Sequence, residues 1–186
     1  MDTAKIAQLG EPVLRNKAKP IVDFDRHTIQ LIDSLIATAI ANKGVGIAAP
    51  QISQSLRVFI VASHPSDRYP HAPTMQPTAM INPRILRHSQ AIVKDWEGCL
   101  SVPDLRGLVP RYQQIEVEYT TREGAIEQQT LTDFVARIFQ HELDHLDGIV
   151  FPDRTQKADL YTEAEYRRII NQLTVNSEQQ SVNSNQ

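Results

Sequence analysis

Gln140-His141-Glu142-Leu143-Asp144-His145 is the stretch of sequence around which the predicted fold is organised. His141 and His145 are four residues apart, and on an α-helix this spacing places both imidazoles on one face. Two such nitrogens can bind one metal ion, with Glu142 beside them as a general base. The alternative is a solvated helix that carries two histidines by chance, which the specificity of the motif disfavours. We therefore interpret the stretch as a metal-binding helix.

The residues around this motif favour a helix whose buried face carries the histidines. Thr132 can cap the start of the helix, Asp133 suits its first turn, and Gly148 stands where a helix commonly ends. The inward-facing stripe consists of Phe134, Ile138, His141 and His145. Because the ligand stripe is also the buried stripe, the sequence predicts a recessed metal site.

Length and composition set broad limits on the class of protein. A chain of 186 residues predicts one domain, and 41% hydrophobic with 22% charged residues is typical of a globular protein. The net charge of −3 without a basic block argues against nucleic acid or an anionic membrane as a partner. No apolar run approaches the about 18 residues of a membrane span, and the N-terminus lacks the core of a signal peptide. A cytoplasmic location is therefore expected.

The order of the predicted elements indicates an α+β fold. In this fold, antiparallel strands pack around the central metal-binding helix, with one helix near the N-terminus and another near the C-terminus. Asp25 is expected to cap a first helix that ends near Asn42, and Thr162 with Glu165 forms a capping box for the last helix. Strands are expected at 56–62, 80–86, 90–94, 115–120 and 125–131, the last two joined by a hairpin turn at 122–124.

Two polar segments are predicted to lie outside this framework. The prolines of residues 63–77 predict a long loop, and residues 174–186, rich in Asn, Gln and Ser, predict a disordered tail. Residues 1–173 are expected to form a single catalytic domain.

The third metal ligand must come from elsewhere in the chain, because a catalytic site of this type uses three protein ligands and an open position. A histidine six residues after His145 would complete one known pattern, but Phe151 occupies that place. Glu163 and Glu165 are alternatives on the last predicted helix. Cys99, the single cysteine, is the better candidate, because it is the one soft ligand that can complete a site with two histidines. The alternative for Cys99 is a buried thiol that packs as a small hydrophobe.

A second conspicuous stretch is Gly44-Val45-Gly46-Ile47-Ala48-Ala49-Pro50-Gln51. Its glycines and small side chains let the backbone approach another group closely. A phosphate-binding loop is a poor interpretation, because no helix pattern follows and no Lys-Ser/Thr pair closes the motif. From these residues alone, a tight turn into a packed core is the plainer interpretation, with Gln51 as a polar side chain at its end.

Three segments together carry a family resemblance. They are Gly44–Gln51 (GVGIAAPQ), Glu97–Ser101 (EGCLS) and Gln140–Leu146 (QHELDHL). Their sequences, order and approximate spacing resemble the three motifs of peptide deformylases, and the resemblance covers most of residues 5–155. It implies a cytoplasmic enzyme that removes the formyl group from the N-terminal methionine of newly synthesised polypeptides.

The resemblance implies a role for each residue of the motifs. The metal ligands would be Cys99, His141 and His145. Glu142 would carry the proton between the attacking water and the leaving amine. Gln51 through its side-chain amide and Leu100 through its backbone N–H would donate hydrogen bonds to the oxyanion.

The substrate would bind beside the metal. Phe134 and Ile138 are expected to line an apolar pocket for the methionine side chain, although periodicity alone makes them ordinary core residues. The backbone at Val45, Gly46 and Gly98 resembles the edges that hold an extended peptide by strand addition. The resemblance therefore implies N-formylmethionyl peptides as the binding partner.

Further expectations concern the surroundings of the site. Glu97 and Arg106 are expected to pair and to brace the cysteine loop. One thiolate and two imidazoles suit zinc, and the resemblance implies Fe(II) as the working ion, with Zn, Ni or Co able to occupy the site. The last helix resembles the one that some family members dock on the ribosome near the exit tunnel, and here it carries Arg167 and Arg168 together with acidic residues.

Two rival functions remain open from the sequence. The first is another His-Glu-x-x-His metallopeptidase that cleaves internal peptide bonds. The second is a non-catalytic protein that binds a metal or a peptide. The joint presence of Glu142, Gln51 and Cys99, which have complementary catalytic roles, argues against the second rival. An assay with a formyl-Met peptide and a longer unformylated peptide distinguishes the first.

Overall fold

The structure, a computed structural model, describes residues 3–66 and 69–183, with side chains as far as Leu173. Within these residues the chain forms two antiparallel sheets and three α-helices, so the predicted α+β class is confirmed. The helices are α1 (Arg26–Ala41), α2 (Asp133–Leu146) and α3 (Glu163–Asn183).

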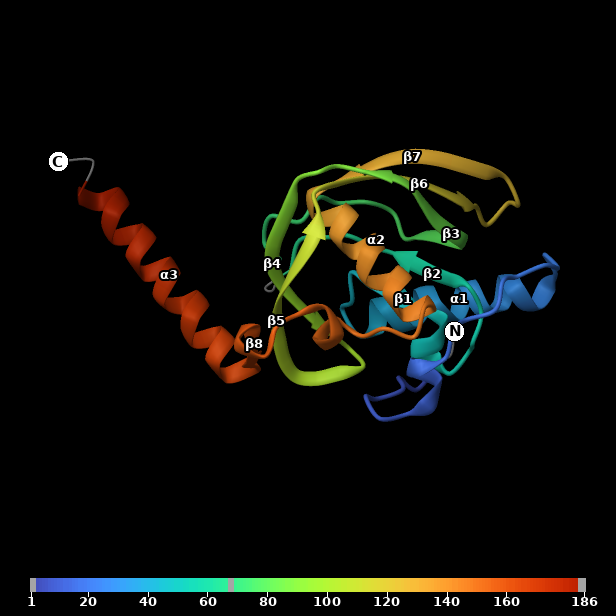
Figure 1. Ribbon diagram of the computed structural model, residues 1–186, viewed down its shortest axis with the longest axis horizontal. Helices are drawn as coiled ribbons and strands as arrows, with labels where there is room; N and C mark the ends of the chain where they lie inside the picture. Colours follow the sequence, from blue (N-terminus) through green and yellow to red (C-terminus); the bar gives the residue numbers. More distant parts are fainter. Residues whose placement is uncertain (1–2, 67–68, 184–186) are drawn as a thin grey trace.

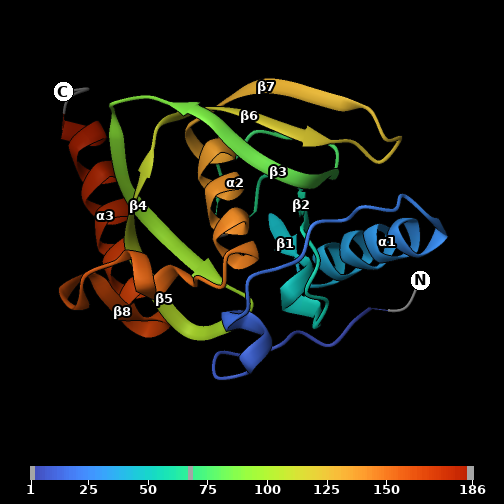
Figure 2. The ribbon, with the colours of Figure 1, turned by 45° about the vertical axis from the view of Figure 1, so that its right-hand side comes forward.

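All paired strands in the two sheets run antiparallel. The five-stranded sheet has the order β1 (Gly46–Ala48), β2 (Val58–Val61), β3 (Thr78–His88), β6 (Gln114–Thr120) and β7 (Ile126–Thr132). The three-stranded sheet has the order β4 (Ile92–Cys99), β5 (Val102–Tyr112) and β8 (Leu160–Thr162). Figures 1 and 2 show α2 between the two sheets, with β4 and β5 on one side and β2, β3 and β6 on the other.

Strand β2 explains how one sheet can be covered on both faces. Side chains alternate along a strand, and all four residues of β2 are buried. Phe59 and Val61 belong to the core beneath α2, whereas Val58 and Ile60 belong to the core beneath α1. A continuous apolar run such as β2 is what a strand packed on both faces requires.

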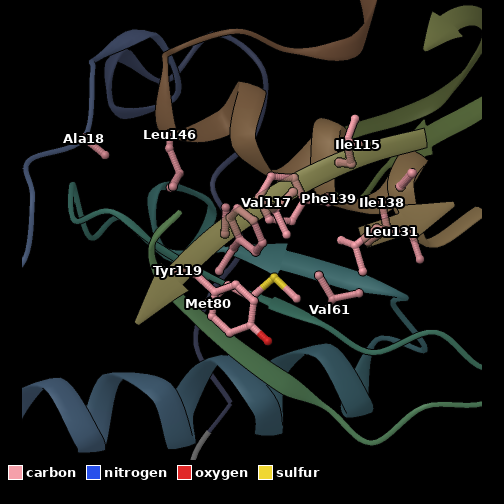
Figure 3. Packing of buried hydrophobic residues seen from close by; sticks show 13 residues of the cluster. Ala18, Val61, Met80, Ile115, Val117, Tyr119, Leu131, Ile138, Phe139 and Leu146 are labelled. Atoms are coloured by element: carbon pink, nitrogen blue, oxygen red, sulfur yellow. The ribbon is translucent and has the colours of Figure 1, made fainter. Parts of the chain in front are cut away.

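The core beneath α2 determines where the histidine-bearing helix sits. Phe139 on α2 meets Phe59 on β2 edge to face, with ring centroids 5.1 Å apart. Figure 3 shows Phe139 close to Val117 of β6, and Tyr119 of the same strand belongs to the same buried cluster. Full burial of each such side chain contributes about 1.5–3 kcal/mol to stability. The face of α2 that points away from the three-stranded sheet is therefore held against the five-stranded sheet by apolar packing.

The ends of the helices agree only in part with the sequence prediction. Asp25 caps α1 as predicted, because its carboxylate accepts a hydrogen bond from the Thr28 N–H at 3.0 Å. Thr132 precedes α2 but makes no capping hydrogen bond with its side chain. Strand β7 runs directly into α2, and the chain turns at Asp133, whose φ is +49°. Gln113 supports this turn, since its carbonyl accepts from the Asp133 N–H at 2.7 Å.

The strand predictions hold for β2, β3, β6 and β7 of the five-stranded sheet, but they miss β1, which was expected to be a turn, and they fall short for the three-stranded sheet. The predicted segments at 80–86, 115–120 and 125–131 lie in β3, β6 and β7, and the predicted hairpin joins the last two. Strand β5 was not predicted, because it contains Pro103, Gly107 and Pro110, and both residue types are disfavoured inside strands. In the structure β8 pairs only with residues 105–107 of β5, so both prolines lie outside that segment.

Helix α3 continues past the predicted boundary of the catalytic domain. It extends to Asn183, although the sequence predicts disorder from Thr174, and it contains neither glycine nor proline to stop it. The side chains after Leu173 and residues 184–186 lie outside the described residues, and the boundary at residue 173 stays a prediction. Figure 1 shows α3 projecting away from the two sheets. Among the described residues, none of the helices combines the length and apolar character needed to cross a membrane.

Gly148, just after α2, yields a prediction about stability. Its φ is +75°, and a Cβ there would lie 2.6 Å from the carbonyl oxygen of Arg15. We expect Gly148→Ala to lose about 1–2 kcal/mol through backbone strain and about 1–3 kcal/mol more through displacement of the neighbouring backbone. Urea unfolding measures the loss.

Gly124 is the matched control for Gly148→Ala. It has a φ of +84° in the β6–β7 hairpin turn, but nothing lies within 4 Å of an added Cβ. Gly124→Ala should therefore show the backbone strain alone. Equal losses in the two variants would contradict the close approach of Arg15 to Gly148.

Candidate active site

The three predicted metal ligands come together from two separate layers of the fold. Cys99 is the last residue of β4, and His141 and His145 lie on α2. The Cys99 Sγ lies 3.2 Å from the His145 Nε2, and one ligand atom from each of the three residues lies within 4.8 Å of the others. A single ion can contact three atoms at such spacing.

The two imidazoles differ in their hydrogen bonds and in the direction in which their pKa values are shifted. His141 Nδ1 lies 2.8 Å from the Glu97 Oε2, which fixes the ring and leaves the other nitrogen for an ion. Burial opposes charge on His141, but its hydrogen bonds to Cys99 and Glu97 raise its pKa well above the usual value. Burial lowers the pKa of His145 well below the usual value, so this ring is neutral, as a metal ligand must be. One thiol and two imidazoles therefore fit a divalent transition metal.

Glu142 is buried beside these ligands without a hydrogen-bond partner for its Oε2 among the described residues. Burial raises the pKa of its carboxyl to about 7. Strand β1 passes so close that a Cβ on Gly46 would lie 2.5 Å from the Glu142 Oε1. An unpaired carboxylate in a site of this kind is suited to exchange protons with a bound molecule.

Gln51 reaches the same place from the short 3-10 turn Ala49–Ile52. Its Oε1 accepts from the Ala48 N–H at 2.8 Å, which orients the amide group. Its Nε2 then donates to the Cys99 Sγ at 3.4 Å and to the Ser101 Oγ at 3.2 Å. The N–H₂ group of Gln51 therefore points at the ligand cluster. Leu100 follows Cys99 in the turn between β4 and β5.

A buried ion network lies behind His141. Glu97 accepts two hydrogen bonds from Arg111, at 2.9 and 3.0 Å, and one from Arg137 at 2.9 Å. Burial alone would raise the pKa of Glu97, but the charge of Arg111 and the hydrogen bonds from His141 and Arg111 hold it well below the usual value. Glu97 is therefore an anion that accepts from three side chains at once.

The network also ties α2 to the second sheet. Arg137 on α2 donates to the backbone carbonyls of Val93 at 2.7 Å and Val109 at 2.8 Å, which belong to β4 and β5. Asp144, also on α2, accepts from Arg111 at 2.6 Å. The sequence analysis missed Arg137 and Asp144. Arg137 lies four residues before His141, so a charged residue on the buried stripe was the available signal.

The predicted pair between Glu97 and Arg106 is wrong. Glu97 lies opposite Gly107 in the register of β4 and β5, so it shares a face with Gly107 and not with Arg106. Arg106 points to the other face, where its Nε lies 2.5 Å from the Glu163 Oε2. Arg111, four residues further along β5 than Gly107, supplies the charge that the prediction assigned to Arg106.

The ligand cluster opens into a cavity of about 330 Å³. The five residues predicted to contact substrate all line it, and they are Val45, Gly46, Gly98, Phe134 and Ile138. Strands β1 and β4, each at the edge of its sheet, both contribute lining residues. Its walls also include Arg106 and two residues of α3, Glu163 and Arg167. The cavity therefore extends from the candidate metal ligands to the start of the last helix.

Comparisons with known proteins agree with this arrangement. The model of the polypeptide deformylase family matches residues 3–160. Peptide deformylase 2 of Nostoc sp. is 61% identical over 171 residues, which cover 91% of this chain and 96% of that protein. Peptide deformylase 2 of Shewanella oneidensis is 46% identical, with 81% of this chain and 83% of that protein covered.

Solved structures show the same fold. The Met-Ala-Ser-bound crystal structure of a class I type b peptide deformylase from Acinetobacter baumannii has a TM-score of 0.81 at 44% identity. The match covers 82% of this chain and 98% of that one. A peptide deformylase from Synechococcus elongatus, in complex with actinonin, has a TM-score of 0.75 at 30% identity, with 83% and 79% covered. The family model and the relatives together show that this chain belongs to the polypeptide deformylase family.

Proposed function

We propose that this chain is a metal-dependent peptide deformylase in which Cys99, His141 and His145 hold the ion and Glu142 moves the proton. Family membership gives the reaction, which is removal of the N-formyl group from newly made polypeptides. The observation that carries the assignment of residues is the convergence of three ligand atoms beside the unpaired carboxylate of Glu142.

Each residue has a defined part in the proposed reaction. A divalent ion held by Cys99, His141 and His145 would lower the pKa of a water in contact with it to about 7, so that the nucleophile would be available near neutral pH. Glu142 accepts the proton of the attacking water and returns it to the amine as the C–N bond breaks. Gln51, held by the Ala48 N–H, donates its amide hydrogen to the oxygen on which negative charge develops. The Leu100 N–H is the proposed second donor.

The peptide is proposed to bind in extended form between two strand edges. Strand β1 is an edge of the five-stranded sheet and β4 an edge of the three-stranded sheet, and both line the cavity. Backbone at Val45, Gly46 and Gly98 can therefore hydrogen-bond to the substrate backbone. The methionine side chain would lie against Phe134 and Ile138, which line the cavity beside His141.

The identity of the ion and the setting of the reaction belong to the same proposal. Thiolate and imidazole ligands suit Fe(II), Zn, Ni and Co, and Fe(II) is proposed as the working ion. The reaction is placed in the cytoplasm, on polypeptides that emerge from the ribosome. Helix α3 projects from the body with Arg167 and Arg168 in its described part, and it is the proposed point of contact with the ribosome (Figure 1).

The test of the proposed function uses three peptides. Formyl-Met-Ala-Ser should release formate, whereas Met-Ala-Ser and a longer unformylated peptide should stay intact. Treatment with a chelator should abolish formate release, and Fe(II), Ni(II) or Co(II) added back should restore it. Cleavage of internal bonds in the unformylated peptide would favour a metallopeptidase. Intact formyl peptide with a metal-replete protein would favour a non-catalytic role.

A further inference from the structure

A group of three charged side chains that joins α3 to β5 lines the cavity described above. The Arg106 Nε lies 2.5 Å from the Glu163 Oε2, and the Arg167 Nε lies 3.0 Å from the Glu163 Oε1. All three side chains line the cavity. Glu163 therefore stands between two guanidinium groups at the point where the cavity meets α3.

Arg106 is held close to the peptide-binding edge. A Cβ on Gly98 would lie 1.7 Å from its Nη1, so the guanidinium fills the space that any other residue at position 98 would occupy. Its side chain is 9% exposed, and its Cζ lies 5.3 Å from the ring centroid of Tyr166. Arg106 is therefore a fixed positive charge next to the residue that precedes Cys99.

The proposed function decides which part of a substrate reaches this charge. The formyl group must lie at Cys99 and Glu142, where the reaction occurs, and the methionine side chain lies against Phe134 and Ile138. The residues after methionine then extend along the edge of β4 at Gly98. Because the cavity is continuous from Glu142 to Glu163, those residues approach Arg106 and Glu163.

We propose that Glu163 is a specificity-determining residue, which neutralises Arg106 and so prevents the enzyme from favouring acidic residues after the formylmethionine. This inference rests on the proposed function. With Glu163 present, the three side chains sum to one positive charge, and Arg167, whose side chain is 72% exposed, is well screened by solvent. Without Glu163, the buried Arg106 would present its charge to the substrate unopposed.

The test compares Glu163→Gln with the wild type on three peptides that carry Glu, Gln or Lys at the second residue after formylmethionine. In the variant, kcat/KM for the Glu peptide relative to the Gln peptide should rise about 3–10-fold, and the ratio for the Lys peptide should fall. The change should shrink as ionic strength rises from about 0.1 M to about 1 M, since the Debye length falls from about 10 Å to about 3 Å.

Two variants serve as controls. Glu165→Gln makes the same change in net charge on the same helix turn, but Glu165 accepts from the Thr162 N–H and does not line the cavity. Glutamine can take that capping role, so this variant should keep the wild-type ratios. Glu163→Asp keeps the charge beside Arg106 and should also keep them.

Each outcome is decisive. Equal shifts in Glu163→Gln and Glu165→Gln, or no shift in either, would overturn the role of Glu163. A fall in kcat for all three peptides alike would also overturn it, because Glu163 would then only position Gly98 through Arg106. Turnover of the Gln peptide by the wild type tests the reaction separately. Its absence would overturn both proposals, whereas normal turnover with unchanged ratios would overturn only this one.

Discussion

Glu142→Gln is expected to lower kcat for formyl-Met-Ala-Ser by about 10²–10⁴-fold, which is the range for loss of a general base. Glutamine has nearly the same shape as glutamate, so α2 and the imidazoles beside it should be undisturbed. The amide cannot accept the proton of the attacking water. Metal content after gel filtration should therefore match that of the wild type, while formate release in a coupled assay is lost.

The control for Glu142→Gln is Glu123→Gln in the exposed β6–β7 turn, which changes net charge equally and should leave kcat unaltered. Loss of the metal from Glu142→Gln would assign Glu142 a structural role in the site. Undiminished turnover would show that another group serves as the base.

The second large effect is expected from Glu97→Ala. This substitution removes the carboxylate that Arg111 and Arg137 share and leaves Arg111 with Asp144 as its remaining carboxylate partner. Breaking a buried pair in this way costs about 3–5 kcal/mol. His141 also loses the acceptor of its Nδ1, which should weaken metal binding about 10–100-fold. Urea unfolding of the metal-free protein measures the first effect, and competition with a chelating indicator measures the second.

Glu118→Ala provides the contrast to Glu97→Ala. Glu118 pairs with Arg84, whose side chain is 64% exposed, so removal of Glu118 should cost far less stability than removal of Glu97. Glu97→Gln keeps hydrogen-bond acceptance by one oxygen and should lie between the two, which gives a usable variant where alanine prevents folding. Similar losses of stability in Glu97→Ala and Glu118→Ala would contradict the claim that burial makes the ion pairs of Glu97 more important for stability than the exposed pair of Glu118.

Local patterns were sufficient to predict much of the fold. The cap at Asp25, the spacing of the histidines and the alternation across the β6–β7 hairpin depend on residues near one another in the chain, and these elements form as predicted. Strand β5 was missed because its pairing with β4 outweighs the local effect of Pro103 and Pro110. Tertiary pairing of this kind leaves no local pattern in one sequence.

The candidate site shows the same division between local and distant information. The motifs named the residues that the structure brings together around Cys99, although their catalytic roles stay predictions. The partner of Glu97 could not be chosen correctly, because the choice between Arg106 and Arg111 depends on the register of β4 against β5. Arg137 was overlooked because an arginine on a helix is usually exposed, and here three backbone carbonyls and Glu97 accept from it.

The position of α2 between two sheets has a consequence for how the protein responds to metal supply. Cys99 belongs to the three-stranded sheet, while the helix that carries the histidines is packed on the five-stranded sheet. An ion shared by these groups would act as a reversible cross-link between the halves of the molecule. By mass action, free metal at about 100 times its dissociation constant would add about 2.7 kcal/mol to stability. The melting temperature would then follow the metal concentration of the buffer.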